Sequence, residues 1–516
     1  MALTDWFLAP GERGNPGTRI DARRGDGRAW SDGNLVRPLI HGGTYFAELF
    51  RAVTEMRAGD LLLFTDWRGD PDESLTGEPA TEISRVLCEA AERGVNVRGL
   101  VWRSHLDRLA FSASENRHLG EEIEAAGGQC LLDMRVRTGG SHHQKFVVLR
   151  HPGRPGADVA FVGGIDLAHS RRDDAGHGGD PQRQPMAAVY GPTPPWHDVQ
   201  IAVSGPAVGD VEASFRERWD DPQPLSRNPA HRIADRLRRI DRRARPLPPQ
   251  LPDPPPAGGA SVQILRSYPR RLGGYAFAPQ GERSIARSYR KAFAKAERLI
   301  YLEDQYLWSR PVAEVFAEAL TASPQLRLIA VLPPHPDEDG RISYPPNVIG
   351  RQAALALIRA AGGARVAFYG PENPQGTPVY VHAKVCVVDD TWAAVGSDNF
   401  NRRSWSHDSE LSAAVLGGGF AGELRLALAA EHLGRSPGDV DDLRDPRAAF
   451  EAFTVAARDL EAWHAAGRTG ERPPGRLRPL PEPPVGALTR LWATPLYRGI
   501  YDPDGRPRRL RRRHIY

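Results

Sequence analysis

Two stretches of the sequence each place a histidine two residues before a lysine, and one of them lies in a clear strand pattern. His382 and Lys384 interrupt the apolar run VYVHAKVCVV, which ends at the turn signal Asp389-Asp390. Side chains two apart on a strand project from the same face, so we expect the imidazole and the ammonium group side by side. A nucleophile or proton donor would then stand beside a fixed cation.

The residues after this strand predict a hairpin that returns to the histidine. TWAAV has the pattern of the return strand, and Gly396-Ser397-Asp398-Asn399 follows as a tight polar loop. This loop is expected to bring the Asn399 amide beside His382. Asp389 has the opposite strand parity, so its side chain is predicted to face away and to contact the local backbone.

A second copy of this hairpin pattern lies upstream in the sequence. His143 and Lys145 begin an apolar run, and AFVGGID repeats the return strand and its loop, with Gly164 and Asp166. A single His-x-Lys strand is more often an ordinary surface strand. Two copies with matching loops favour a duplicated catalytic unit.

These motifs resemble those of the phospholipase D superfamily. Its mark is two His-x-Lys-x4-Asp motifs, each followed by a Gly-Gly or Gly-Ser loop with Asn or Asp. The second copy here is complete, whereas Arg150 stands at the Asp position of the first. Position 150 is out of phase with His143 and Lys145, so the change is predicted to alter a turn and to leave the catalytic face unchanged.

The resemblance implies a mechanism through a phosphohistidine. It assigns His143 as the nucleophile and His382 as the general acid, although the similarity of the two halves leaves this assignment reversible. Lys145, Lys384 and Asn399 would hold phosphate oxygens. Gly164, Asp166 and Ser397 occupy the loop positions expected to bind substrate.

Each reactive histidine also needs a carboxylate that fixes its tautomer. The resemblance implies crossed pairing, with Glu410 from WSHDSE on His143 and Asp198 from PWHDV on His382. His142, His143 and His382 lack the ligand spacings of a zinc site, so no metal and no cofactor are expected.

Lysine usage supports the two motifs independently of any family. The chain has four lysines, Lys145, Lys291, Lys295 and Lys384, and arginine supplies the other basic residues. Two of the four lysines lie in the motifs, where a compact point charge is needed and the planar fork of arginine is no substitute.

Composition indicates a globular protein with more than one domain. The 516 residues are 40% hydrophobic and 26% charged, and the net charge of +4 does not by itself indicate a nucleic-acid partner. No apolar run approaches the roughly 20 residues of a membrane span, and the N-terminus lacks the pattern of a signal peptide. Three scattered cysteines fit a reducing compartment. We therefore expect a cytoplasmic protein, with peripheral contact to the inner membrane surface.

Helix and strand patterns alternate in the same order in both halves, which predicts an α/β fold made of duplicated sandwich domains. The resemblance adds an active site at the interface of the halves. The predicted segments are an extended lead-in (1–35), a first α/β domain (36–222), a basic helix with a Pro-rich linker (223–260), a second α/β domain (261–435) and a helical C-terminal extension with a basic tail (436–516).

The resemblance favours a phospholipase D that cleaves the head-group phosphodiester of glycerophospholipids, with water or an alcohol as acceptor. Alternatives left open are a phosphatidyltransferase of the cardiolipin synthase type, a nuclease and a catalytically silent binding protein. We expect a monomer whose phospholipid substrate lies at a membrane surface. The tail Arg506–Arg513 is the favoured docking element, ahead of the basic helix at 232–245.

Overall fold

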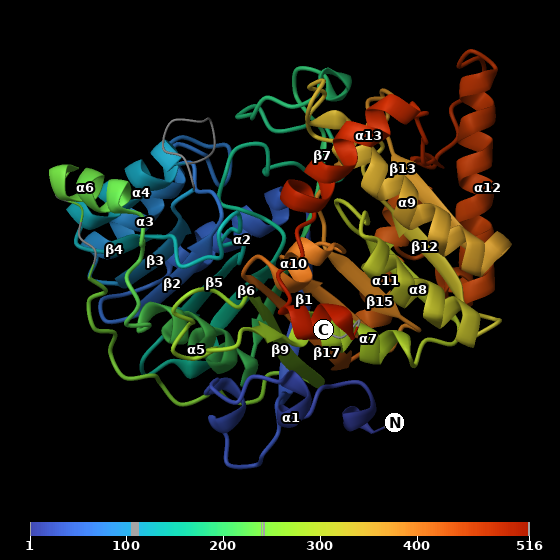
Figure 1. Cartoon of the computed structure of the whole chain (residues 1–516). Coiled ribbons are helices and arrows are strands. Elements are labelled where there is room, and N and C mark those ends of the chain that lie inside the picture. Colours follow the sequence, from blue (N-terminus) through green and yellow to red (C-terminus); the bar gives the residue numbers. More distant parts are fainter. Residues whose placement is uncertain (1, 105–112, 239, 241–242, 514–515) are drawn as a thin grey trace.

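The computed structural model describes residues 2–104, 113–238, 240, 243–513 and 516, and it consists of two α/β halves joined edge to edge (Figure 1). The elements of the first half are β1 (Ser31–Ile40), α2 (Gly42–Thr54), β2 (Leu61–Asp66), α3 (Ile83–Glu92), β3 (Asn96–Trp102), α4 (Ala113–Ala125), β4 (Gln129–Asp133), β5 (Phe146–Arg150), β6 (Val159–Gly163), β7 (Trp196–His197), β8 (Val199–Ser204) and α5 (Ala207–Trp219). Those of the second half are β9 (Ala260–Tyr268), β10 (Glu282–Arg283), α7 (Ser284–Phe293), β11 (Leu299–Glu303), α8 (Arg310–Ala322), β12 (Arg327–Val331), α9 (Tyr344–Gly362), β13 (Val366–Pro371), β14 (Tyr380–Val381), β15 (Val385–Val388), β16 (Trp392–Gly396), α10 (Arg402–Ser406), β17 (Glu410–Gly417) and α11 (Phe420–Leu433). The flanking elements are α1 (Pro10–Arg13), α6 (Pro229–Arg238), α12 (Pro446–Ala465), β18 (Leu477–Pro479), α13 (Ala487–Leu496), the π-helix η7 (Tyr497–Tyr501) and α14 (Arg508–Arg512).

The strands of both halves form one continuous sheet that meets at β1 and β9. Outwards from this junction, the first half has the order β1-β8-β6-β5-β2-β3-β4 and the second the order β9-β17-β16-β15-β11-β12-β13. The directions also correspond, because β2, β3 and β4 are parallel, as are β11, β12 and β13. The duplicated α/β fold predicted from the sequence is thus confirmed.

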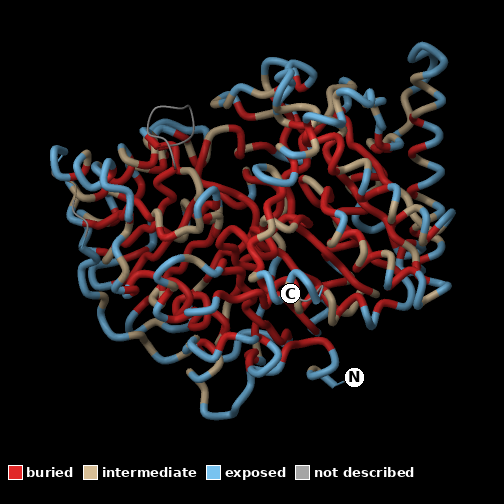
Figure 2. The backbone as a smooth tube through the Cα atoms, in the orientation of Figure 1, coloured by how far each residue is buried: buried red, intermediate tan, exposed pale blue. Residues whose placement is uncertain are grey.

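Both faces of the sheet are covered, which explains why its strands are continuous apolar runs in the sequence. In β15, Val385 and Val387 pack into one hydrophobic cluster, whereas Cys386 and Val388 pack into another on the opposite face. The buried backbone accordingly runs through the middle of both halves, with exposed segments at the periphery (Figure 2).

The helices cover the two faces differently. α5 and α11 contribute to a single cluster that contains strand residues of both halves. On the other face, α2, α3 and α4 belong to a cluster of the first half, and α7, α8 and α9 to a cluster of the second. One shared core therefore joins the halves, and this fixes how the two motifs approach each other.

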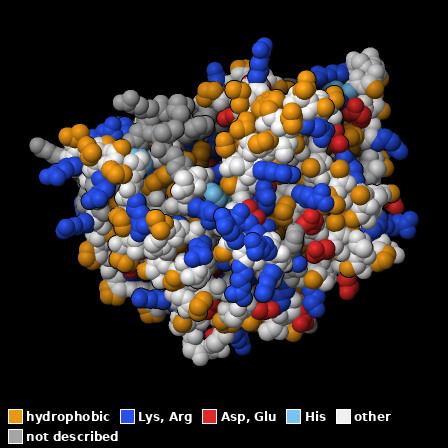
Figure 3. All heavy atoms as spheres, viewed as in Figure 1, with side chains coloured by type: hydrophobic (Ala, Val, Ile, Leu, Met, Phe, Trp, Pro, Cys, Tyr) orange, Lys and Arg blue, Asp and Glu red, His pale blue; other side chains and the backbone are white. Residues whose placement is uncertain are grey.

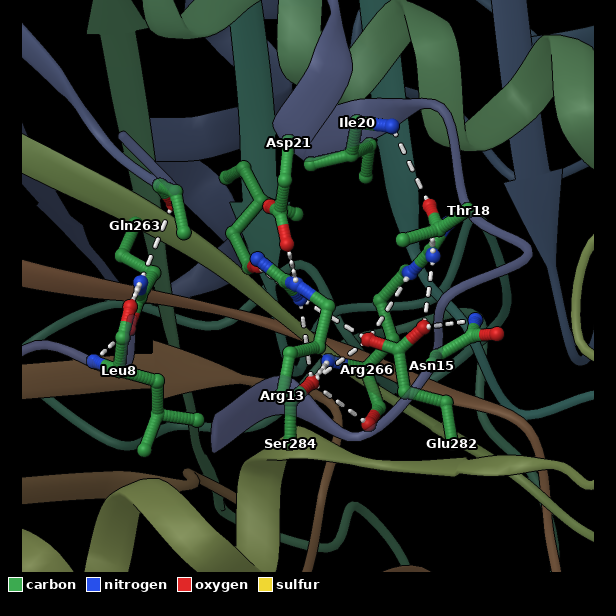
Figure 4. Close-up of polar contacts among 12 residues, drawn as sticks. Leu8, Arg13, Asn15, Thr18, Ile20, Asp21, Gln263, Arg266, Glu282 and Ser284 are labelled. Carbon is green, nitrogen blue, oxygen red and sulfur yellow. Dashed lines mark hydrogen bonds and ion pairs between the residues drawn. The ribbon is translucent and has the colours of Figure 1, made fainter. Parts of the chain in front are cut away.

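The N-terminal residues are packed against the second half, although the sequence suggested an extended lead-in. Arg13 is fully buried, and its guanidinium lies 2.8 Å from Asp21 and 2.9 Å from Glu282 (Figure 4). Glu282 also accepts hydrogen bonds from Asn15 and Arg266, both at 2.7 Å. Buried charges are tolerated when they are paired in this way. Removal of the N-terminal segment would leave the buried carboxylate of Glu282, in β10, without its partners Arg13 and Asn15.

The segment after α6 matches its Pro-rich sequence, because residues 243–259 contain no helix and no regular strand. The C-terminal extension differs from the expectation in one respect. β18 adds an edge strand antiparallel to β13, with Tyr369 opposite Pro479, and three residues are too few for a strand pattern to be recognised in sequence. Within the described residues, no helix combines the length and apolar character needed to cross a bilayer.

Candidate active site

Each motif histidine is held by the backbone of the opposite half. The amide of His143 donates to the carbonyl of Ser409 at 2.9 Å, and the amide of His382 donates to the carbonyl of His197 at 2.7 Å. β7 and β14 pair in parallel at the second contact, and an isolated bridge between His142 and Ser409 forms the first. Because Ser409 and His197 each precede a carboxylate residue, this register directs each carboxylate to the histidine of the other half.

The two carboxylates contact the two histidines in the crossed arrangement. Nδ1 of His143 lies 2.9 Å from Oε2 of Glu410, and Nδ1 of His382 lies 2.6 Å from Oδ2 of Asp198. Both carboxylate side chains are fully buried. Each contact fixes the imidazole and leaves its Nε2 for chemistry at the site.

The loops after the return strands support these carboxylates. Ser397 donates its hydroxyl to Oε2 of Glu410 at 2.6 Å while it accepts from the amide of Leu411. Oε2 of Glu410 thus contacts both the Ser397 hydroxyl and Nδ1 of His143, while burial raises the pKa of the Glu410 carboxyl. Gly164 occupies the matching position in the first half, where a Cβ would come within 2.3 Å of Oδ1 of Asp198. The structure places both residues against the orienting carboxylates, and their expected contact with substrate stays a prediction.

The two lysines are equivalent in position as well as in sequence. The ammonium group of Lys145 donates to the carbonyl of His143, and that of Lys384 donates to the carbonyl of His382. Lys384 also donates to Oε1 of Gln305 at 3.3 Å, and both lysines are buried. His382 and Lys384 were expected within a strand, but they lie between β14 and β15, and His143 and Lys145 lie just before β5. Each motif still places a positive charge next to its histidine.

Before a substrate anion binds, the electrostatic environment favours the neutral form of both imidazoles. Burial is the largest effect that lowers the pKa of His143 well below its usual value, and the charges of Lys145 and Lys384 add to it. Burial likewise lowers the pKa of His382, and the charges of Lys384, Arg171 and Lys145 lower it further. Each histidine therefore responds to the lysine of the other half, so the two motifs form one site. A neutral Nε2 is a competent nucleophile.

Asn399 and Asp166 occupy equivalent loop positions but have different surroundings. The Asn399 side chain is buried, and its Oδ1 has no hydrogen-bond partner among the described residues. Asp166 lies 3.5 Å from Lys145 and 3.3 Å from Arg171. Asp166 thus holds two cations, whereas the Asn399 amide remains available to a ligand.

Two aspartates outside the motifs hold these loops through hydrogen bonds to backbone amides. Asp66, at the end of β2, accepts from the amide of Leu167 at 2.9 Å, and Asp304, directly after β11, accepts from the amide of Phe400 at 3.0 Å. The two are equivalent by strand register, since β2 pairs with β5 as β11 pairs with β15. The signal in the sequence was an Asp at the end of a buried strand in both halves.

Aromatic and arginine side chains complete the walls of the site. The ring of Trp196 lies 5.0 Å from that of His382, and the guanidinium of Arg171 lies 4.2 Å above Trp196. The ring of Trp67 lies 6.3 Å from that of His143. These residues lie outside the two motifs, so the spacing of the motif residues did not predict their place at the site.

The residues at the ends of the two motifs have different roles. Asp389 accepts hydrogen bonds from the backbone amides of Glu297, Arg298 and Leu299. Arg150 is fully buried, with Glu212 at 2.6 Å and Asp158 at 2.9 Å. The Arg150 side chain is thus part of a buried charge cluster at the end of β5, and it is more than a turn residue.

Comparisons with known proteins indicate the family of the chain. A family model described as "Phospholipase D" matches residues 56–311, and one described as "Cardiolipin synthase, PLD-like domain" matches residues 290–428. Phospholipase D alpha 2 of Oryza sativa subsp. japonica is 25% identical, and the match covers 73% of this chain and 61% of the relative. Phospholipase D1 of Saccharomyces cerevisiae is 24% identical, with 84% of this chain and 30% of the relative covered.

The chain therefore spans less than two thirds of the length of these relatives. A similar fold occurs in the crystal structure of phosphatidylserine synthase from Haemophilus influenzae Rd KW20, with a TM-score of 0.53, 12% identity and coverage of 84% of this chain and 94% of that one. With both motifs in one duplicated α/β fold and with family matches across residues 56–428, the chain belongs to the phospholipase D superfamily.

Proposed function

We propose that the protein is a phospholipase D-type phosphodiesterase that acts on the head-group phosphodiester of glycerophospholipids. The observation that carries the proposal is the pair of crossed histidine–carboxylate contacts, His143 with Glu410 and His382 with Asp198. A phosphodiester resists attack because it is an anion, so the site must neutralise its oxygens, supply a nucleophile and protonate the leaving alkoxide. Lys145, Lys384 and the two histidines meet these needs.

In the proposed first step, Nε2 of His143 attacks phosphorus, and the bond to the head-group oxygen breaks. His382 takes part in this step as an imidazolium that donates Nδ1–H to Asp198, and the leaving alkoxide takes the proton from its Nε2. The negative charge of the bound phosphodiester stabilises this protonated form. In the second step, water or another alcohol attacks the phosphohistidine and loses its proton to His382, which releases His143. The greater exposure of the His143 side chain, 16% against 7% for His382, supports this choice of nucleophile.

An apolar surface near the site supports a lipid substrate. Gln305, which contacts Lys384, precedes Tyr306, whose ring stacks on Trp308 at 4.0 Å. The hydroxyl of Tyr497 in η7 donates to the Trp308 carbonyl. Next to this contact, Leu488 and Leu491 of α13 are 82% and 76% exposed, and Trp492 and Ile500 are also exposed. Exposed apolar patches of this kind are typical of membrane or protein contact sites.

Basic residues near the C-terminal segment could add attraction to anionic lipids. A cavity of about 970 Å³ is lined by Arg137, Arg227, Arg270, Arg271 and Arg511, beside the loop that leads to His143. Lys and Arg side chains gather near the centre of the face seen in Figure 3. Each basic residue close to an anionic surface contributes about 1 kcal/mol to binding. We propose that α13 and this basic surface together hold the protein at the bilayer.

A phosphatidyltransferase is the second candidate, because the fold of phosphatidylserine synthase is similar. The two activities differ only in the acceptor of the second step. The test is incubation with mixed phospholipid vesicles, with and without an added primary alcohol, and identification of the products by mass. Phosphatidic acid with water, and a phosphatidyl alcohol when alcohol is added, would support the phospholipase. Turnover that requires a second lipid or alcohol would favour the transferase, and the absence of both products would contradict the proposal.

A further inference from the structure

A cluster of three histidines and one glutamate lies next to Asp198 and contains none of the proposed catalytic groups. His41, at the start of α2, lies 2.8 Å from Oε2 of Glu431 in α11, and His177 lies 2.9 Å from Oε1 of the same residue. Nδ1 of His197 is 3.6 Å from Oε1. One ligand atom from each of the four side chains lies within 4.8 Å of the others. Three imidazoles and one carboxylate are a ligand set of tetrahedral zinc sites.

The three rings are arranged around a common point. Their centroids are 5.0 Å apart for His41 and His177, 5.1 Å for His41 and His197, and 5.6 Å for His177 and His197, with interplanar angles of 87°, 76° and 60°. With a Zn–N distance of about 2.0 Å, each ring centre lies about 3.2 Å from the metal, which gives about 5.2 Å between centres at tetrahedral angles. The observed separations are close to this value.

The outer nitrogens of two of the histidines already have the partners that metal-bound imidazoles use. Nε2 of His197 lies 2.7 Å from Oε2 of Glu303, and Nδ1 of His177 lies 3.1 Å from the Trp196 carbonyl. Metal-ligating histidines usually donate their second N–H to a carboxylate or a carbonyl, which fixes the tautomer. These contacts direct Nδ1 of His197 and Nε2 of His177 into the cluster.

A hydrogen-bonded network without a metal accounts for this cluster less well. Nδ1 of His197 is buried and has no hydrogen-bond partner among the described residues, although it points at Glu431. Buried polar atoms are normally satisfied. His41 and His177 also have positive φ angles of 69° and 51°, which are uncommon outside glycine and often mark functional positions. Arg476 also contacts Oε1 of Glu431, at 3.4 Å.

A neighbouring set, His197, Glu303 and His432, also brings ligand atoms together. Its carboxylate is already used, because Glu303 contacts His197 and His432, both at 2.7 Å, and accepts from the Tyr301 hydroxyl at 2.5 Å. This set therefore fits the role of a supporting shell for the first one.

We propose that His41, His177, His197 and Glu431 bind a divalent transition-metal ion, with Zn²⁺ as the best match to the ligand set. The ion would join the first half, which supplies the histidines, to α11 of the second. It would also brace the peptide around Asp198, because His197 precedes Asp198 and the His41 amide donates to the Asp198 carbonyl at 2.9 Å. This is a positioning role, and no step of the proposed catalysis passes through the ion.

The test uses the full chain without a histidine tag, purified without chelators and dialysed before its metal content is measured by mass spectrometry. We expect one equivalent of zinc per chain, and a loss to about a tenth or less in His177→Ala and in Glu431→Gln. The matched control is His464→Ala, which removes a histidine that also contacts a carboxylate, Glu372 at 2.9 Å, but lies outside the cluster. The control should keep the full equivalent.

Two further measurements keep the test independent of whether the variants fold. Replacement of the ion by Co²⁺ in the wild-type chain should give the visible absorption of a tetrahedral site. Removal of the ion should lower the Tm of the wild-type chain, and added Zn²⁺ should restore it. A wild-type chain without bound metal and without a Tm response to Zn²⁺ would overturn the proposal. Full zinc content in both cluster variants would also overturn it, because the ion would then lie elsewhere.

Discussion

The carboxylate of Glu410 lies 2.9 Å from Nδ1 of His143, although the two residues are 267 positions apart in the chain. The contact crosses from one half of the duplicated fold to the other, and its counterpart between Asp198 and His382 crosses in the opposite direction. Both motif histidines, His143 and His382, thus take their orienting carboxylate from the other half. The site therefore depends on the junction of the halves at β1 and β9.

The first prediction concerns this contact. Glu410→Gln keeps the shape of the side chain but replaces a carboxyl oxygen at the His143 contact with an amide group, which disturbs the tautomer and orientation of the ring, so kcat should fall by about 10²- to 10⁴-fold. Glu423→Gln, on the exposed side of α11, is the matched control and should keep the wild-type rate. Steady-state rates on a soluble phosphodiester, with circular dichroism to check folding, provide the measurement. Equal rates for the two variants would remove Glu410 from the mechanism.

The second prediction concerns pH. Burial lowers the pKa of Lys384 to about 8. Above that value the ammonium loses its charge and its hold on phosphate, so kcat/KM should fall as pH rises through about 8. On the acid side, the lowered pKa of His143 keeps its imidazole neutral, so kcat/KM should persist below the usual histidine pKa.

The scarcity of lysine makes this pKa directly measurable. Lysine-selective isotope labelling gives signals from only four residues, and Lys384→Arg identifies the one that titrates early. Titration of all four lysines near their ordinary value of about 10.4 would contradict the prediction.

The third prediction concerns Arg150, which was expected from the sequence to affect a turn and to leave the catalytic face unchanged. In the structure, Arg150 pairs with Glu212 and Asp158 in a fully buried cluster. Arg150→Asp would put three carboxylates together, and breaking a buried pair of this kind costs about 3–5 kcal/mol in the free energy of unfolding. Urea titration measures the loss.

A charge exchange provides the control for Arg150. Adding Glu212→Arg to Arg150→Asp should recover part of the lost free energy of unfolding, because it restores an opposite charge at the contact. A stability of Arg150→Asp equal to that of the wild type would show that the cluster does not form.

The fourth prediction concerns the membrane. Leu491→Glu in α13 should lower turnover of vesicle lipids several-fold, while turnover of a soluble short-chain phosphodiester stays unchanged. Arg508, Arg509 and Arg512 are exposed, so their replacement by Gln should weaken binding to anionic vesicles, most clearly at low salt. These substitutions test the tail more specifically than deletion of residues 505–516 would. The deletion would also remove Arg506 and Tyr516, which are buried and contact each other. Unchanged turnover of vesicle lipids by Leu491→Glu, together with unchanged vesicle binding by the arginine variant, would place the docking surface elsewhere.

The sequence predicted the duplicated hairpins because strand periodicity is a local property, visible in runs such as VYVHAKVCVV. The positions of Asp198 and Glu410 came from the resemblance alone, since nothing local ties them to a histidine. The burial of Arg13 against Glu282 and the meeting of His41 with Glu431 could not be predicted, because the partners are 269 and 390 positions apart. Such contacts depend on how the two halves join.

The most direct test of the account is to trap the phosphohistidine. His382→Ala should still react once with an aryl phosphodiester, because a nitrophenolate leaves without protonation, but without His382 to activate water the adduct should persist. Peptide mass spectrometry after rapid quenching should find the aryl phosphoryl group on His143, with about one nitrophenol released per chain. An adduct on His382 in the His143→Ala chain, with none on His143 in the His382→Ala chain, would reverse the assignment. No adduct on either histidine would contradict the two-histidine mechanism.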